Sequence, residues 1–95
     1  METIPEFEYD PAKSQANLEK HGIDFEAAQA LWLDSRKAVG PTVSPDEVRW
    51  MLVAMLDGKL WSAVFTDRAG RIRLISVRRS RPKEAANYGR QTDQR

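Results

Sequence analysis

Two β-rich runs, VRWMLVAML and KLWSAVFT, are separated by Asp57-Gly58. This pair between two such runs is a strong hairpin signal, because both central residues of a type I′ turn need a positive φ. A second turn signal, Arg68-Ala69-Gly70, leads into the run RIRLISVRR over residues 71–79. The sequence therefore predicts an antiparallel meander of three strands.

Two helices are expected before this meander. Asp10 can cap the first helix, Pro11 suits its first turn because the missing N–H there costs nothing, and Gly22 is a natural end. Asp24 can cap a second helix over roughly residues 25–33, where large apolar residues recur at helical spacing. These two helices can cover one face of the sheet.

The remaining segments complete an α+β fold. FEY (7–9) should be a short extended piece, residues 35–47 a short or edge strand passing into a loop, and a short helix should follow Pro82. We expect two N-terminal helices packed on a three- to four-stranded antiparallel sheet, with a short C-terminal helix. The chain has 95 residues, so residues 1–90 should form one domain and 91–95 a disordered tail.

Both faces of the expected sheet are apolar. In the first hairpin strand Trp50 and Leu52 point one way, whereas Met51 and Val53 point the other way. Two interpretations follow for the second face. Either a partner chain covers part of it, or the strands are central and the small terminal helix suffices.

Charge is distributed unevenly along the chain. Residues 1–65 carry six Lys/Arg and eleven Asp/Glu, a net charge of −5, while residues 66–95 carry nine and three, a net of +6. The cationic third is suited to a polyanion, although a solvated surface explains a charge run equally well.

The sequence lacks the residues that several kinds of catalytic, metal and nucleotide site require. The chain has no cysteine and one histidine, and its sequence shows no Gly-rich phosphate loop, no Ser/His/Asp set and no carboxylates at metal-ligand spacing. We therefore expect no metal and no cofactor. METIPEFEYD is not a secretory signal, and no run approaches the roughly 18 apolar residues of a membrane span. A cytoplasmic protein without membrane contact is expected.

Arginines dominate the last predicted strand. Strand alternation places Arg71, Arg73 and Arg79 on one face, and Arg78 on the other unless a bulge re-aims it. A guanidinium fork binds phosphate through two parallel N–H groups and stays charged at cellular pH. Charged side chains also protect an exposed strand from aggregation, so each arginine has a second explanation.

Besides the arginines, four residues are candidates for chemistry: Lys13, Lys20, His21 and Tyr88. Histidine is the side chain best suited to acid–base chemistry, and His21 shares a polar stripe with Lys13, Asn17 and Lys20, although a histidine at a helix end also complements the helix dipole. Tyr88 is suited to three roles, as a core anchor, a stacking platform or a proton donor.

Arg49 precedes Trp50 in the first hairpin strand. A charge at this position is awkward unless it faces a cleft or an anion, so Arg49 is more informative than an arginine in a loop.

Three segments together resemble one family. FEYDPAKSQANLEKHGIDFEAA contains the frame D-x-x-K-x-x-x-N-x-x-KHG-x-x-F, and EVRW and RIRLISVRRS followed by EAANY come next in order. Over residues 7–88 the sequence resembles the BrnT toxins, the ribonuclease halves of bacterial toxin–antitoxin pairs, which are similar in fold to RelE-type toxins. It departs from the family pattern at Val77, Ala54 and Ala85, where alanine, glycine and arginine are usual.

The resemblance implies a metal-independent endoribonuclease that inhibits translation and growth. It implies neutralisation by a ribbon-helix-helix, BrnA-like antitoxin in a hetero-oligomer, which meets promoter DNA only through that antitoxin. The implied site comprises the catalytic residues His21, Lys20, Arg49, Arg73, Arg78 and Tyr88 and the RNA-binding residues Lys13, Arg71 and Arg79. The alternatives are a catalytically silent RNA-binding or regulatory module that uses the same basic cleft, and an interaction protein that binds no nucleic acid.

Overall fold

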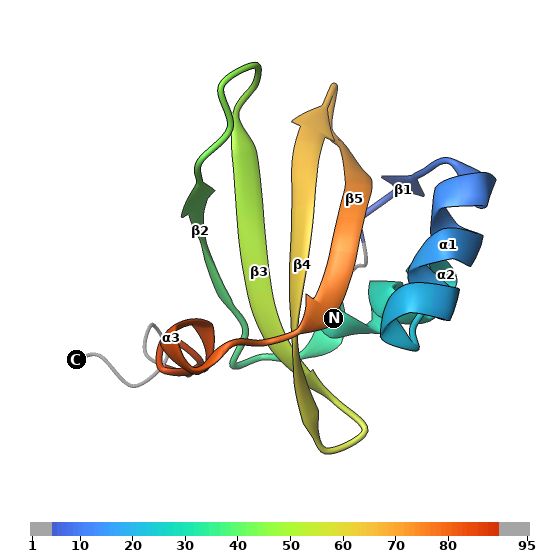
Figure 1. Ribbon diagram of the computed structural model, residues 1–95. Coiled ribbons are helices and arrows are strands. Elements are labelled where there is room, and N and C mark those ends of the chain that lie inside the picture. Colours follow the sequence, from blue (N-terminus) through green and yellow to red (C-terminus); the bar gives the residue numbers. More distant parts are fainter. Residues whose placement is uncertain (1–4, 90–95) are drawn as a thin grey trace.

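A computed structural model describes residues 5–89 and forms an α+β fold around one five-stranded sheet (Figure 1). The strands lie in the order β1-β5-β4-β3-β2. The elements in chain order are β1 (Phe7–Glu8), α1 (Pro11–His21), α2 (Phe25–Ala28), the 3₁₀ helix η1 (Gln29–Leu33), β2 (Ala38–Thr42), β3 (Arg49–Leu56), β4 (Lys59–Arg68), β5 (Arg71–Arg79) and α3 (Pro82–Ala85). The expected tail, residues 91–95, lies outside the described residues.

The sheet is larger than predicted, and it is mixed. Strands β2 to β5 form the antiparallel part, which confirms the meander and adds the expected edge strand β2. The two-residue β1 pairs with β5 in parallel, with Glu8 opposite Arg73. The prediction of three or four antiparallel strands is therefore wrong in number and type, because a segment of two residues carries no pattern that reveals its partner.

Local signals at turns and helix ends are confirmed. Asp57 and Gly58 have φ angles of 53° and 76°, as a type I′ turn requires. The Asp10 side chain accepts a hydrogen bond from the amide of Ala12 at 2.8 Å, and Gly22 ends α1 with a φ of 83°.

The second predicted helix divides into two types of winding. Only Phe25–Ala28 is α-helical, and Gln29–Leu33 winds as a 3₁₀ helix. Over so few residues, periods of 3.0 and 3.6 put the same apolar positions on one side, so spacing alone does not separate them. Trp32 of η1 packs edge-to-face against Phe7 and Phe65.

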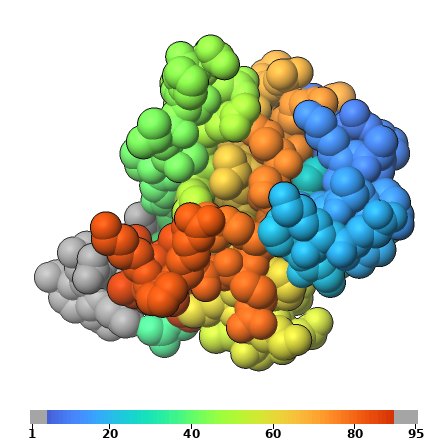
Figure 2. All heavy atoms as spheres, viewed as in Figure 1, coloured from blue at the N-terminus to red at the C-terminus, as the bar shows by residue number. Residues whose placement is uncertain are grey.

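The core lies between one sheet face and the segment α1–α2–η1. Phe25, Leu31, Leu52, Leu74 and Val77 are its largest fully buried apolar side chains. The opposite face is crossed at one end by the short α3 and is seen frontally in Figure 2, with β5 and α1 on one side and the β2–β3 connection on the other. Within residues 5–89, no helix is long and apolar enough to cross a membrane.

Candidate functional site

A bulge in β5 decides which arginines lie together. Val64 pairs with Ser76, but the next residue of β4, Phe65, pairs with Leu74, so Ile75 is one residue extra. Because side chains alternate with a period of two, the extra residue reverses the alternation of everything after it. The bulge therefore places Arg78 on the same face of the sheet as Arg73, which unbroken alternation would not do.

The bulge also corrects one expectation. Arg79 lies opposite Trp61, on the core side of the sheet, and its guanidinium carbon is 5.7 Å from the Trp61 ring centroid. It therefore does not share a face with Arg71 and Arg73, as unbroken alternation predicted. A cation–π contact instead accounts for its position.

Five arginines lie on the sheet face opposite the core, which we call the arginine face. They are Arg49 of β3, Arg68 of β4, and Arg71, Arg73 and Arg78 of β5. Arg73 pairs with Thr66 and Arg78 pairs with Ser62, so both point away from the core-facing Phe65 and Trp61. Arg49 lies on the same face because it alternates with Trp50, which packs against the core.

Four arginines of this face have a glutamate partner. The pairs are Arg49 with Glu47 at 3.1 Å, Arg71 with Glu6 at 3.3 Å, Arg73 with Glu8 at 3.1 Å and Arg78 with Glu84 at 2.7 Å. The first three pairs are at least 30% exposed on both sides, and exposed ion pairs contribute little free energy, so an incoming anion can exchange with them.

The Arg78–Glu84 pair is more deeply set. Both terminal nitrogens of Arg78 donate to Glu84, one to each carboxylate oxygen, at 2.8 and 2.7 Å. Glu84 also accepts from the Ser62 hydroxyl at 2.8 Å and the Arg81 amide at 2.9 Å. The hydrogen bonds from Arg78 lower the pKa of Glu84 to about 2, despite its burial. This pair anchors α3 on the sheet.

Asn17 fixes α1 against the free edge of β5. Its amide nitrogen donates to the carbonyls of Val77 at 2.9 Å and Ile23 at 2.7 Å, and its oxygen accepts from the Val77 amide at 3.2 Å. The side chain thus pairs with β5 as a strand would. His21 lies one helical turn beyond Asn17 on the same side of α1.

Tyr88 is held at a different position. Its hydroxyl donates to Asp34 at 2.6 Å, and the same carboxylate oxygen accepts from the Met55 amide at 2.8 Å. Burial and the Asp34 carboxylate raise the pKa of Tyr88 above its ordinary value, so the phenol keeps its proton. The contact holds Tyr88 against the segment before β2.

Residues 9–84 match a protein family described as the ribonuclease toxin, BrnT, of type II toxin–antitoxin systems. The chain belongs to the BrnT family. The resemblance inferred from the sequence is thereby confirmed, and with it the class of ribonuclease toxins whose partner is a protein antitoxin. Among curated proteins, no match to the chain is found.

The BrnT chain brings only part of the predicted site together. Arg49, Arg71, Arg73 and Arg78 share the arginine face, and α1 carries Lys13, Lys20 and His21 beside β5. Lys13 and Lys20 are exposed and His21 is partly buried. Arg79 and Tyr88 are held elsewhere, by Trp61 and Asp34 respectively.

Two residues of this BrnT site were not selected from the sequence. Glu84 is the partner of Arg78, and its side chain also accepts a hydrogen bond from the Arg81 amide at the start of α3. Thr66 lies beside Arg73 on the arginine face, and only the strand register shows this.

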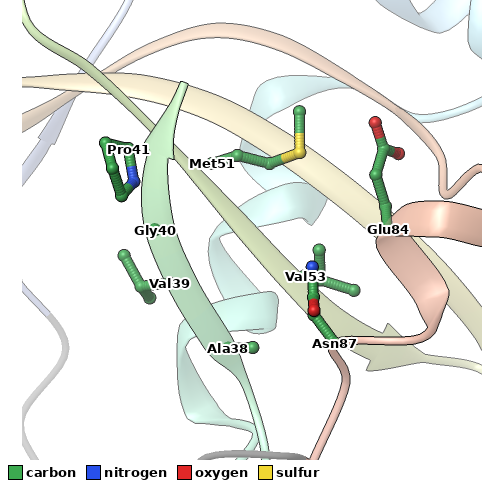
Figure 3. A pocket seen from close by; sticks show the side chains of 8 residues that line it. All are labelled: Ala38, Val39, Gly40, Pro41, Met51, Val53, Glu84 and Asn87. Atoms are coloured by element: carbon green, nitrogen blue, oxygen red, sulfur yellow. The ribbon is translucent and has the colours of Figure 1, made fainter. Parts of the chain in front are cut away.

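A hollow opens between β2 and α3 of the BrnT chain (Figure 3). Met51 and Val53 of β3 and Glu84 and Asn87 of the α3 segment contribute to its lining, together with residues of the edge strand β2. The hollow therefore adjoins the arginine face at the end where α3 is anchored.

Proposed function

We propose that this BrnT protein is a metal-independent endoribonuclease that cleaves RNA on its arginine face. The observation that carries the proposal is the β5 bulge, because it places Arg73 and Arg78 on one face with Arg49 of β3. Guanidinium groups on one surface suit a phosphodiester backbone and the additional charge of its transition state.

The proposed reaction uses the 2′-hydroxyl of RNA as the nucleophile, which restricts it to RNA. A base removes the 2′-hydroxyl proton as the oxygen attacks the adjacent phosphorus. The bond from phosphorus to the 5′ oxygen then breaks, and an acid protonates the leaving oxygen. The products are a 2′,3′-cyclic phosphate and a 5′-hydroxyl. The reaction consumes no oxidant, and it does not require a metal ion.

His21 is our candidate for one of the two proton-transfer roles, because histidine is the side chain most often used as a general acid or base. Lys20 and Tyr88 compete for the other role. Tyr88 keeps its proton and is bonded to Asp34, whereas Lys20 is adjacent to His21 on α1. This favours Lys20.

The arginines supply the electrostatic part of the mechanism. Arg78 is proposed to stabilise the phosphorane, whereas Arg49 and Arg73, which lie further along the sheet, are proposed to hold the RNA beside the cleaved phosphate together with Lys13 and Arg71. Arg79 is left out of this group because it lies on the core side of the sheet.

We further propose a ribbon-helix-helix, BrnA-like antitoxin that joins the toxin in a cytoplasmic hetero-oligomer and alone contacts promoter DNA. Met51 and Val64 remain partly exposed on the arginine face, and Met55 is 38% exposed, which supports a protein partner over this side of the sheet. Co-purification with the product of the adjacent reading frame tests this pairing.

The test of the nuclease is incubation of the antitoxin-free protein with single-stranded RNA in EDTA. We expect wild type to cleave and both His21→Ala and Arg73→Ala to lose about 100-fold or more in rate. Arg79→Ala removes the same charge from the opposite face and should cleave as wild type does. Equal cleavage by His21→Ala would refute the histidine role, and cleavage only without EDTA would refute metal independence.

One observation favours a second candidate, a catalytically silent RNA-binding module. Arg49, Arg71 and Arg73 are matched by exposed carboxylates, an arrangement that also suits a weak and exchangeable binding surface. Such a module binds RNA with an affinity that falls steeply with salt concentration, and it leaves the RNA uncut in the incubation described above.

A further inference from the structure

We propose that Thr66, flanked by Arg73 and Arg49, binds a second RNA phosphate, distinct from the phosphate that is cleaved. This inference rests on the proposed function, since it assumes that RNA lies along the arginine face. It assigns a binding role to a threonine that the family match does not single out.

The Thr66 hydroxyl is the first reason. Thr66 is 4% exposed, and within the described residues its side-chain oxygen is the buried side-chain polar atom that has no hydrogen-bond partner. Leaving a buried hydroxyl unpaired costs free energy, so native structures pair nearly all such groups. An unpaired hydroxyl between two arginines indicates a position where an acceptor binds.

The strand register supplies the second reason. Arg73 lies directly opposite Thr66 across the β4–β5 pair. On the other side, Trp50 pairs with Phe65, so Arg49 is the neighbour of Thr66 across the β3–β4 pair. Cross-strand neighbours have Cβ atoms about 5 Å apart. The row formed by Arg49, Thr66 and Arg73 therefore places one hydroxyl between two arginine side chains.

This row is separate from the proposed cleavage position. Arg78 lies opposite Ser62, and Thr66 follows Ser62 by four positions along β4. At a rise of about 3.3 Å per residue, the two rows are about 13 Å apart. The two rows are thus two positions along the sheet, and we assign a different phosphate of one RNA strand to each.

The existing partners of the row explain how a phosphate enters. Glu8 and Glu47 hold Arg73 and Arg49 through pairs with at least 30% exposed side chains, and both carboxylates accept hydrogen bonds only. A phosphate that replaces them at the guanidinium groups also offers an oxygen to the Thr66 hydroxyl. The proposal requires the flanking arginines to move off their glutamates, so that the phosphate reaches the buried hydroxyl.

The test compares Thr66→Val, which keeps the shape and removes the hydroxyl, with Thr66→Ser, which keeps the hydroxyl. On a long RNA, we expect Thr66→Val to raise KM about tenfold with kcat unchanged, the scale of one hydrogen bond to a charged group, while Thr66→Ser stays near wild type. A dinucleotide that reaches only the cleavage position should be cleaved equally by all three proteins. Equal KM values for wild type and Thr66→Val on long RNA would overturn the proposal.

A binding measurement separates this inference from the proposed function. A 2′-O-methyl RNA has phosphates but no nucleophile, and Thr66→Val should bind it about tenfold more weakly than wild type does, even if wild type never cuts RNA. Thermal unfolding completes the test, because removal of an unpaired buried hydroxyl should leave Tm unchanged or raised. A marked fall in Tm for Thr66→Val would show that the hydroxyl is already partnered, and would also overturn the proposal.

Discussion

Replacement of Glu84 by glutamine should make the stability of the protein much less dependent on acidic pH. Glu84 accepts four hydrogen bonds, two of them from Arg78, and its side chain is only 16% exposed. Glutamine keeps the size of the side chain and removes its charge. Arg78 would then be left without an anionic partner in a partly buried position, which is costly.

The expected magnitude follows from the pKa of Glu84. A change from an ordinary 4.5 to about 2 corresponds to about 3 kcal/mol of stability at neutral pH. Because the pKa is lowered in the folded state, this stability is complete above about pH 5 and is lost as the pH falls through about 2. Glu84→Gln should therefore lower Tm by roughly 10 to 20 °C at pH 7, and the gap to wild type should narrow towards pH 2.

The assay is urea or thermal unfolding followed by circular dichroism at several pH values. Glu47→Gln is the matched control, since Glu47 forms a more exposed pair with Arg49 and its loss should cost less than about 1 kcal/mol. A wild-type minus Glu84→Gln difference that is the same at pH 7 and pH 3 would refute the assignment of this free energy to the ionised carboxylate.

Two further variants test other contacts. Asn17→Ala strips the β5 edge of its side-chain partner and should cost about 2 to 4 kcal/mol in urea unfolding, whereas Gln15→Ala, on the exposed side of α1, should stay within about 0.5 kcal/mol of wild type. Tyr88→Phe loses the 2.6 Å bond to Asp34 and should cost about 1 to 2 kcal/mol while RNA cleavage stays at the wild-type rate; a hundredfold slower cleavage would instead make Tyr88 the acid.

Features that are local in the chain could be predicted from the sequence. The Asp57-Gly58 turn and the ends of α1 depend on the φ angles and hydrogen bonds of a few adjacent residues, and all were found. Features that depend on pairing between distant segments could not. The β1–β5 pair and the β5 bulge are set by register, and RIRLISVRR alternates too regularly to show where the extra residue falls.

The candidate site was likewise predictable only where residue type, and not strand register, decides its composition. Residue type identified the arginines as phosphate ligands, but which of them share a face depended on the bulge, and Arg79 was misplaced for that reason. The partners Glu84 and Thr66 come from α3 and β4, and neither has a chemical signature that sets it apart from an ordinary surface glutamate or strand threonine. Asn17 was assigned to a polar stripe, and its burial against Val77 follows only from the position of α1 on the sheet edge.

The uneven charge of the chain has a structural explanation in the parallel pairing of β1 with β5. Glu6 and Glu8 belong to the acidic N-terminal part, and this pairing brings them to Arg71 and Arg73 of the basic C-terminal third. Arg71 and Arg73 are therefore neutralised while these glutamates are engaged, and their positive charge becomes available to a ligand by exchange.

Exchange at such pairs costs little because they are exposed, but it requires an anion that satisfies more donors than one carboxylate does. A phosphodiester strand offers oxygens at successive positions along β5, whereas an isolated small anion offers them at one. The arrangement should thus favour a chain of phosphates over a single one, as a ribonuclease that binds RNA at several positions requires.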